Sequence, residues 1–164
     1  MPATFRRPAL IAAAATALLA AGAVTVAAGS PADAASRPQV LRFGVQFSPF
    51  TIIDVPPLQT GDGDFRPGDY TVFSDVLTDR AGRTVGTEGG TGVITKVDST
   101  GVQLNYTVSL QLAGGQITAQ GLASTDPGKH LAITGGTGPY TGAAGRFDLT
   151  ELGDGTGTLT LTLG

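Results

Sequence analysis

Asp75 is the residue of this sequence best placed to do chemistry. It lies in the stretch Val72 to Thr78, where Phe73, Asp75 and Leu77 alternate with other residues and therefore share one face of a predicted strand. A carboxyl group on an apolar face inside a cavity has a raised pKa and can act as a general acid. The alternative is an aspartate exposed at the end of a strand, where most charged residues lie. We take Asp75 as the candidate catalytic residue.

Four further side chains are candidates for contact with a ligand. Glu88 precedes Gly89-Gly90. Like Asp75, it is either a carboxyl group inside a cavity or an exposed charged residue. The two tyrosines either line a cavity or pack between neighbouring strands. The candidate ligand-binding residues are Phe73, Glu88, Tyr106 and Tyr140.

Composition excludes several kinds of site. Cysteine is absent and His130 is the single histidine, so a disulfide framework, a thiolate metal site and a poly-histidine metal site are all excluded. His130 follows the turn at Asp126-Pro127-Gly128 and is predicted to be a solvated residue at the start of a strand. The net charge is −3 and no basic patch is present, so we expect no nucleic-acid partner and no binding to an anionic membrane. Neither a metal nor another cofactor is predicted.

The N-terminal segment, residues 1–34, is predicted to be an export signal peptide. Arg6-Arg7 precede an apolar stretch from Ala9 to Ala28, and Ala32-Asp33-Ala34 supplies the small residues of a cleavage site. The two arginines also fit twin-arginine export. An uncleaved membrane anchor is the alternative, because the apolar stretch is about long enough to span a bilayer. We expect a secreted mature domain of residues 35–164.

The mature region has the pattern of an all-β protein. Apolar residues alternate with polar ones, and turn signals interrupt the alternation at short intervals, whereas sustained helical spacing is missing. About eight antiparallel strands are expected to close into an up-and-down β-barrel without exposed edges. The predicted strand segments are 40–47, 51–55, 69–78, 84–97 with a bulge at Gly89-Gly90, 102–112, 116–122, 131–134, 146–150 and 156–163.

A glycine-rich segment follows the predicted strand 131–134. Gly135, Gly136 and Gly138 let the backbone turn sharply, and Pro139 fixes its exit direction. A phosphate-binding loop would need a following helix and a suitably placed lysine, and neither is present. We predict a structural turn.

Three motifs resemble those of the plant dirigent and allene oxide cyclase superfamily. They are Val72 to Thr78, Arg83 to Gly89 and Leu131 to Gly138, and Ala119-Gln120-Gly121 resembles a further cyclase strand. The resemblance covers roughly residues 40–164. It implies an eight-stranded barrel, usually a homotrimer, with a hydrophobic cavity open at one end. Dirigent proteins steer the coupling of phenoxy radicals made by a separate oxidase, and allene oxide cyclases close a ring in a fatty-acid epoxide.

The functional residues of these families are largely absent here. The first strand, Val40 to Phe47, lacks their acidic residue, and Leu122 and Ala144 stand where dirigent proteins carry arginines. Only Asp75 sits at a matching acidic position. A cyclase-like reaction would therefore depend on Asp75 and on confinement of the substrate.

Three hypotheses about function follow. A cofactor-free barrel that binds an apolar small molecule and steers its cyclisation or coupling predicts a cavity with one or two buried acids. A non-catalytic exported binding barrel predicts a cavity without buried ionisable groups. A structural cell-surface barrel predicts an interior filled by side chains.

Overall fold

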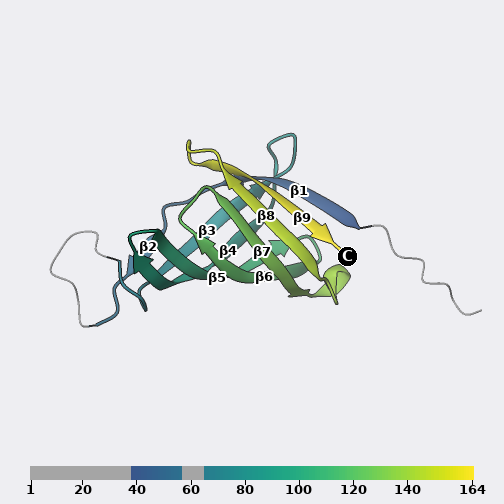
Figure 1. The fold of residues 1–164 in the computed structure, drawn as a ribbon. Helices are drawn as coiled ribbons and strands as arrows, with labels where there is room; N and C mark the ends of the chain where they lie inside the picture. Colours follow the sequence, from purple (N-terminus) through teal and green to yellow (C-terminus); the bar gives the residue numbers. More distant parts are fainter. Residues whose placement is uncertain (1–37, 57–64) are drawn as a thin grey trace, which may run out of the picture. The chain divides into compact units, whose positions relative to one another are not determined.

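The computed structural model describes residues 38–56 and 65–164 (Figure 1). The predicted signal peptide lies outside these residues. In the described ranges, no helix has the length and apolar character to cross a membrane. The elements are β1 (Gln39–Gln46), β2 (Thr51–Ile53), β3 (Tyr70–Thr78), β4 (Thr84–Asp98), β5 (Gly101–Leu112), β6 (Gly115–Ser124), β7 (Gly128–Gly136), the 3₁₀ helix η1 (Gly138–Tyr140), β8 (Gly145–Glu151) and β9 (Thr156–Leu163).

The strands form a closed antiparallel barrel. Neighbours follow the order β1-β9-β8-β7-β6-β5-β4-β3, and β1 returns to pair with β3 from Gly44↔Thr78 to Gln46↔Val76. The short strand β2 pairs with the first residues of β3, and β1 pairs with its last residues. Both strands therefore lie along the same edge of β3. The predicted eight-stranded all-β barrel is confirmed.

Alternation places apolar side chains inside the barrel. In β9 the leucines face inward, with Leu159 and Leu161 fully buried, whereas the threonines between them face outward. In β5 the even-numbered residues from Leu104 to Leu112 face inward in the same way. The period of two found in the sequence therefore sets the two faces of the wall.

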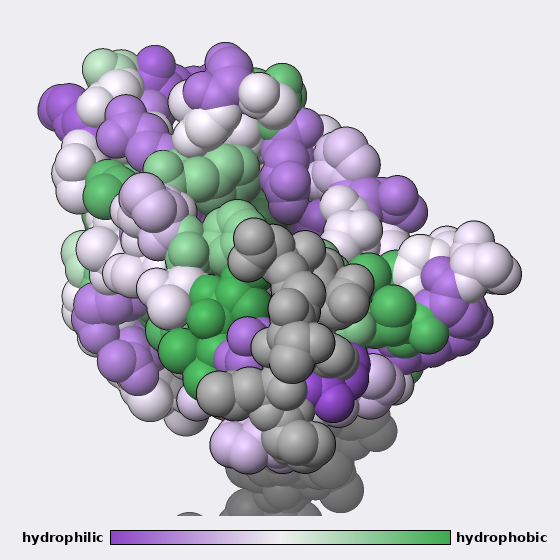
Figure 2. Space-filling model, turned by 90° about the vertical axis from the view of Figure 1, so that its left-hand side faces the viewer, coloured by the Kyte–Doolittle hydropathy of each residue, from purple (hydrophilic) through white to green (hydrophobic). Residues whose placement is uncertain are grey.

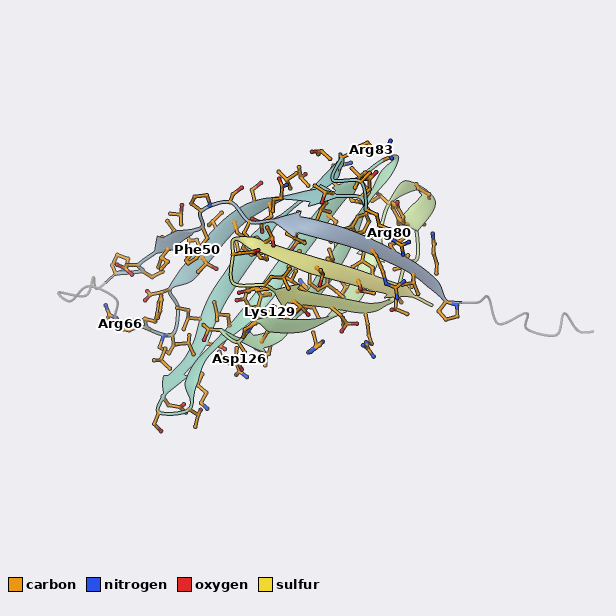
Figure 3. The ribbon with its side chains drawn as sticks, turned by 90° about the horizontal axis from the view of Figure 1, so that it is seen from above. Phe50, Arg66, Arg80, Arg83, Asp126 and Lys129 are labelled. Atoms are coloured by element: carbon orange, nitrogen blue, oxygen red, sulfur yellow. The ribbon has the colours of Figure 1, made fainter. Side chains whose placement is uncertain are left out.

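The two ends of the barrel differ. The end that carries η1 and the turn between β3 and β4 is packed with large aliphatic side chains, namely Leu77, Leu110, Leu112, Ile117, Ile133, Leu161 and Leu163. Figure 3 shows Arg80 and Arg83 at this end and Phe50 and Arg66 at the opposite one. Arg83 pairs with Asp79 at 2.7 Å within that turn. A cavity with room for a ligand lies at the opposite end, which we call the open end.

The glycine-rich segment turns the chain later than the sequence predicted. Gly135 and Gly136 are the last residues of β7, and the turn begins at Gly138, which has a φ of +60° and opens η1. Glycine is required there because a positive φ strains other residues. Tyr140, at the end of η1, packs against the core cluster at the filled end.

The bulge predicted at Gly89-Gly90 is wrong. Strand β4 runs through both glycines, which pair with Ser74 and Phe73 of β3. The irregularities in β4 lie instead at Val85, which the ladder with β3 skips, and between Ile94 and Lys96. A Cβ atom at Gly90 would collide with the carbonyl of Thr107 and lie 3.1 Å from Phe73 Cζ. The glycines thus allow a close approach of neighbouring strands.

This close approach makes Gly90→Ala destabilising. We expect the free energy of unfolding to fall by about 1–3 kcal/mol, because the added methyl group forces the strands apart. Urea denaturation measures the change. The matched control is Gly128→Ala in β7, where a Cβ atom would make only an ordinary contact, 3.7 Å from His130 Nε2. That variant should be neutral or stabilised by up to about 1 kcal/mol, and equal losses in the two variants would contradict the argument.

Candidate active site

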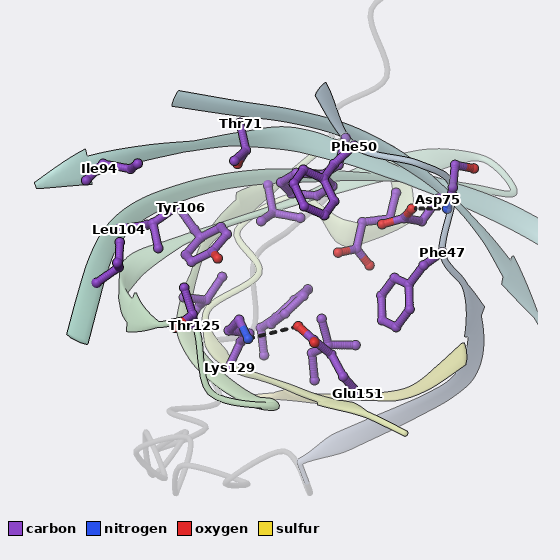
Figure 4. A pocket seen from close by; sticks show the side chains of 18 of the residues that line it. Phe47, Phe50, Thr71, Asp75, Ile94, Leu104, Tyr106, Thr125, Lys129 and Glu151 are labelled. Carbon is purple, nitrogen blue, oxygen red and sulfur yellow. Dashed lines mark hydrogen bonds and ion pairs between the residues drawn. The ribbon is translucent and has the colours of Figure 1, made fainter. Parts of the chain in front are cut away.

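The open end of the barrel contains a cavity of about 440 Å³. Figure 2 looks onto the side where Figure 1 shows β2, and apolar side chains gather there between polar ones. Most of the cavity wall is aromatic or aliphatic (Figure 4). The aromatic lining residues are Phe47, Phe50, Phe65, Phe73, Tyr106 and Phe147, and the aliphatic ones are Ile94, Val102, Leu104, Val108, Leu131 and Leu149.

Glycines of β4 make room for two of these rings. Phe73 and Tyr106 meet edge to face, with ring centroids 6.4 Å apart and planes inclined by 62°. A Cβ atom at Gly92 would lie 2.9 Å from Tyr106 Cε1. With no side chain at that position, the tyrosine ring lies against the backbone of β4, so the cavity has a firm aromatic wall.

Asp75 lies where the pairing between β1 and β3 stops. It is only 4% exposed and lines the cavity on the same face of β3 as Phe73. Beyond Gln46 the chain leaves β3, and the freed amide of Ser48 donates a hydrogen bond of 2.8 Å to Asp75 Oδ1. Burial raises the pKa of Asp75, and the bond from the Ser48 amide opposes this rise because it favours the ionised form.

Glu88 lies directly opposite Asp75 in the ladder between β3 and β4. The two side chains point into the same cavity, since residues paired across an antiparallel ladder share a face. Glu88 is 2% exposed, and its Oε2 atom has no hydrogen-bond partner among the described residues. Burial, and to a lesser degree the negative charge of Asp75, raise the pKa of Glu88 to about 8.

The two carboxyl groups therefore ionise at different pH. Glu88 holds its proton at neutral pH, because its pKa is about 8 and no described residue donates to its Oε2 atom. Asp75 is the member that ionises first, because it accepts the Ser48 amide. A neutral acid beside a carboxylate can donate a proton at one point of a ligand and accept one at another.

A second polar group lies across the cavity. Lys129 of β7 is 5% exposed, and its Nζ atom pairs with Glu151 Oε1 of β8 at 2.8 Å and also donates to the carbonyl of Asp126. Figure 4 shows Glu151 and Asp75 on opposite sides of the cavity. The sequence analysis missed this pair. Alternation through Lys129, Leu131 and Ile133 was the signal that could have placed the lysine inside the barrel.

Four of the five predicted site residues come together in this cavity: Phe73, Asp75, Glu88 and Tyr106. Tyr140 does not line it and lies in η1 at the filled end. His130 is exposed on the outside, as expected, where its Nδ1 atom lies 2.7 Å from Asp148 Oδ1. Within the described ranges, no three acidic or histidine side chains cluster in a way that could hold a metal ion.

The chain is similar to known proteins in both sequence and structure. The family model described as the allene oxide cyclase barrel like domain matches residues 58–160. No curated protein matches the sequence. Among solved structures, a pyocyanin demethylase is 25% identical, with a TM-score of 0.68 over 77% of this chain and 100% of its own.

Two further solved structures share the fold. A Diels-Alderase from Streptomyces koyangensis is 16% identical, with a TM-score of 0.58 over 79% of this chain and 71% of its own. A pterocarpan synthase dirigent protein is 16% identical, with a TM-score of 0.57 over 78% of this chain and 94% of its own. At 16% identity, both similarities support a shared barrel fold and nothing more.

Protonation of Glu88 can be tested directly, because Glu88 and Glu151 are the only glutamates of the chain. In a ¹³C NMR titration of their carboxyl carbons, Glu88 should titrate near pH 8. Between its ordinary pKa of 4.5 and about 8, the folded state then holds a proton that the unfolded state has lost. The free energy of unfolding should therefore fall as the pH rises through this window.

Glu88→Gln should remove this part of the pH dependence and stabilise the protein at pH 8.5 relative to the wild type. The control is Asp98→Asn. Hydrogen bonds from Lys96 and Thr100 lower the pKa of Asp98, so its titration falls at more acid pH and the slope between pH 5 and 8.5 stays unchanged. A Glu88 resonance that titrates near pH 4.5 would contradict the buried neutral acid.

Proposed function

The chain belongs to the allene oxide cyclase barrel-like family, and we propose that it binds an apolar small molecule in its cavity and steers the cyclisation or coupling of that molecule. The family model covers more than half of the chain, so the resemblance found in the sequence is confirmed. One observation carries the proposal: Asp75 and Glu88 face each other in a cavity whose walls are otherwise mainly apolar.

The cavity walls support a role in holding one conformation of a substrate. Rings on several sides, among them Phe47, Phe50 and Tyr106 (Figure 4), restrict how a flexible or planar molecule can lie. Confinement of reacting atoms in one orientation lowers the barrier to ring closure without a cofactor. A reaction whose product is an isomer of its substrate also consumes no partner molecule.

The carboxyl pair supports proton transfer within that confinement. The neutral Glu88 carboxyl can donate a proton to an oxygen or nitrogen atom of the bound molecule as its bonds rearrange. Asp75 can then accept the proton that the rearranged molecule releases, and transfer of that proton from Asp75 to Glu88, which faces it across the ladder, restores the starting state. This requires no metal, no redox cofactor and no covalent intermediate.

The alternatives differ in what they require of the interior. A structural barrel with a filled interior is disfavoured by the cavity at the open end. A non-catalytic binding barrel needs the cavity but gives the buried acids no role. Secretion, a homotrimer and a separate oxidase partner stay predictions. The likeness to a pyocyanin demethylase adds demethylation of pyocyanin to the reactions that a first screen should include.

Ligand binding can be tested with the neutral aromatic dye N-phenyl-1-naphthylamine, which fluoresces more strongly in apolar surroundings. The wild type should bind the dye, and Leu149→Trp should abolish binding, because Leu149 lines the cavity and a larger ring fills it. The control is Leu122→Trp on the outer face of β6, where Leu122 is 57% exposed. Dye binding that survives Leu149→Trp, or is absent from the wild type, would contradict a ligand cavity.

Catalysis by the carboxyl pair predicts a loss of turnover with retention of binding. A metabolite that native mass spectrometry finds bound to the protein supplies the substrate. Glu88→Gln should lower the kcat for this substrate by about 10²–10⁴-fold. The affinity for the dye should stay within about twofold of the wild type, because glutamine has nearly the same shape as glutamate. Asp75→Asn keeps an acceptor for the Ser48 amide and should show the same pattern. Unchanged kcat in both variants would favour the non-catalytic binding barrel.

A further inference from the structure

We propose that Lys129 selects ligands that carry an acidic group, and that Glu151 occupies the place of this group when the cavity is empty. The inference rests on the proposed function, because it concerns the ligand of the same cavity. It identifies Lys129 as a residue that determines specificity. It also defines the chemical class of the ligand: an apolar or aromatic body with one anionic oxygen group, such as a carboxylate, a phenolate or a sulfonate.

Lys129 is a buried lysine. Only 7% of the Lys129 side chain is exposed, and it lines the cavity. A buried ammonium group is costly unless anionic or polar partners satisfy it. Its three N–H donors have two partners among the described residues, the Asp126 carbonyl and Glu151 Oε1. One donor is thus left for an oxygen atom in the cavity.

Glu151, the partner of Lys129, is much more exposed than the lysine. The Glu151 side chain is 40% exposed, far more than Lys129, so the carboxylate of Glu151 can turn outward into water at small cost. Glu151 also lies close enough to Tyr106 for its negative charge to add to burial in raising the pKa of that hydroxyl group. A ligand anion that replaces Glu151 would be held by Lys129 within reach of Tyr106.

The Lys129–Glu151 pair lies across the barrel from the two carboxyl groups. Lys129 and Glu151 belong to β7 and β8, and the order of the strands places these opposite β3 and β4, which carry Asp75 and Glu88. Apolar residues such as Leu131 and Phe147 line the same cavity. A ligand whose acidic end binds Lys129 therefore presents its other end to Glu88. Like charge would keep the same anion away from Asp75.

Two dyes that differ by one group test this inference. 8-Anilino-1-naphthalenesulfonate is N-phenyl-1-naphthylamine with an added sulfonate, so the pair compares an anion with a neutral molecule of the same ring system. Lys129→Met should weaken binding of the sulfonate dye roughly ten- to hundredfold, as expected for a lost charged hydrogen bond. Binding of the neutral dye should stay within about twofold. Lys129→Arg should restore much of the loss.

The control variant is Lys96→Met. Lys96 is the other lysine of the chain and lies near the exposed turn between β4 and β5, where it pairs with Asp98. The change in net charge is the same, so this variant shows how much of any loss comes from the overall field of the protein. It should leave the affinity for both dyes unchanged.

Glu151→Gln provides a test that keeps Lys129 in place and covers the case in which Lys129→Met fails to fold. Removal of the competing carboxylate should tighten binding of the sulfonate dye severalfold and leave the neutral dye unchanged. Equal effects of Lys129→Met on both dyes, or unchanged sulfonate binding in the Glu151→Gln variant, would overturn the inference but leave the ligand cavity intact. Failure of both dyes to bind the wild type would instead contradict the proposed function, and this inference with it.

Discussion

Closure of the barrel depends on a ladder of three residue pairs between β1 and β3. Gly44 makes this close contact possible, because a Cβ atom there would lie 2.6 Å from Thr78 Oγ1. Beyond Gln46 the chain leaves β3, and the carboxylate of Asp75 accepts a hydrogen bond from the amide of Ser48, which would otherwise lack a partner. Closure removes the exposed edges of the sheet, and the place where it stops is also the place where a polar group enters the cavity.

The buried carboxyl groups are costly to the fold. Two acids in an apolar interior lose hydration, and one oxygen of Glu88 gains no hydrogen bond from the described residues in return. Leucine or phenylalanine at these positions would fill the open end as Leu77 and Leu110 fill the other. Residues that break the local rules of packing concentrate at functional sites. This contrast between the two ends of one barrel is a physical reason to look for function at the open end.

Much of the fold could be predicted, because alternation is a local property of the sequence. Alternation of apolar and polar residues predicted all the strands and the inward face of β5. It also predicted that Phe73 and Asp75 share one face of β3. Whether the interior is filled or hollow depends on the summed volumes of side chains from eight strands, which no single segment reveals. The Asp75–Glu88 pair depends on the register between β3 and β4, and Lys129 was missed because the predicted strand began three residues too late. Tyr140 was expected at a cavity but belongs to a helical turn, whose direction a strand pattern cannot give.

A hollow barrel with a wholly apolar wall would bind many molecules in many orientations. Here the wall carries two polar groups on opposite sides, the carboxyl pair on β3 and β4 and the Lys129–Glu151 pair on β7 and β8. Apolar contacts supply most of the affinity in such a cavity, whereas a few placed polar groups fix the orientation. A molecule held at one end and confined by rings along its length reaches Glu88 with the same atoms each time. Selectivity then follows from geometry, and the pair of carboxyl groups supplies the proton transfer.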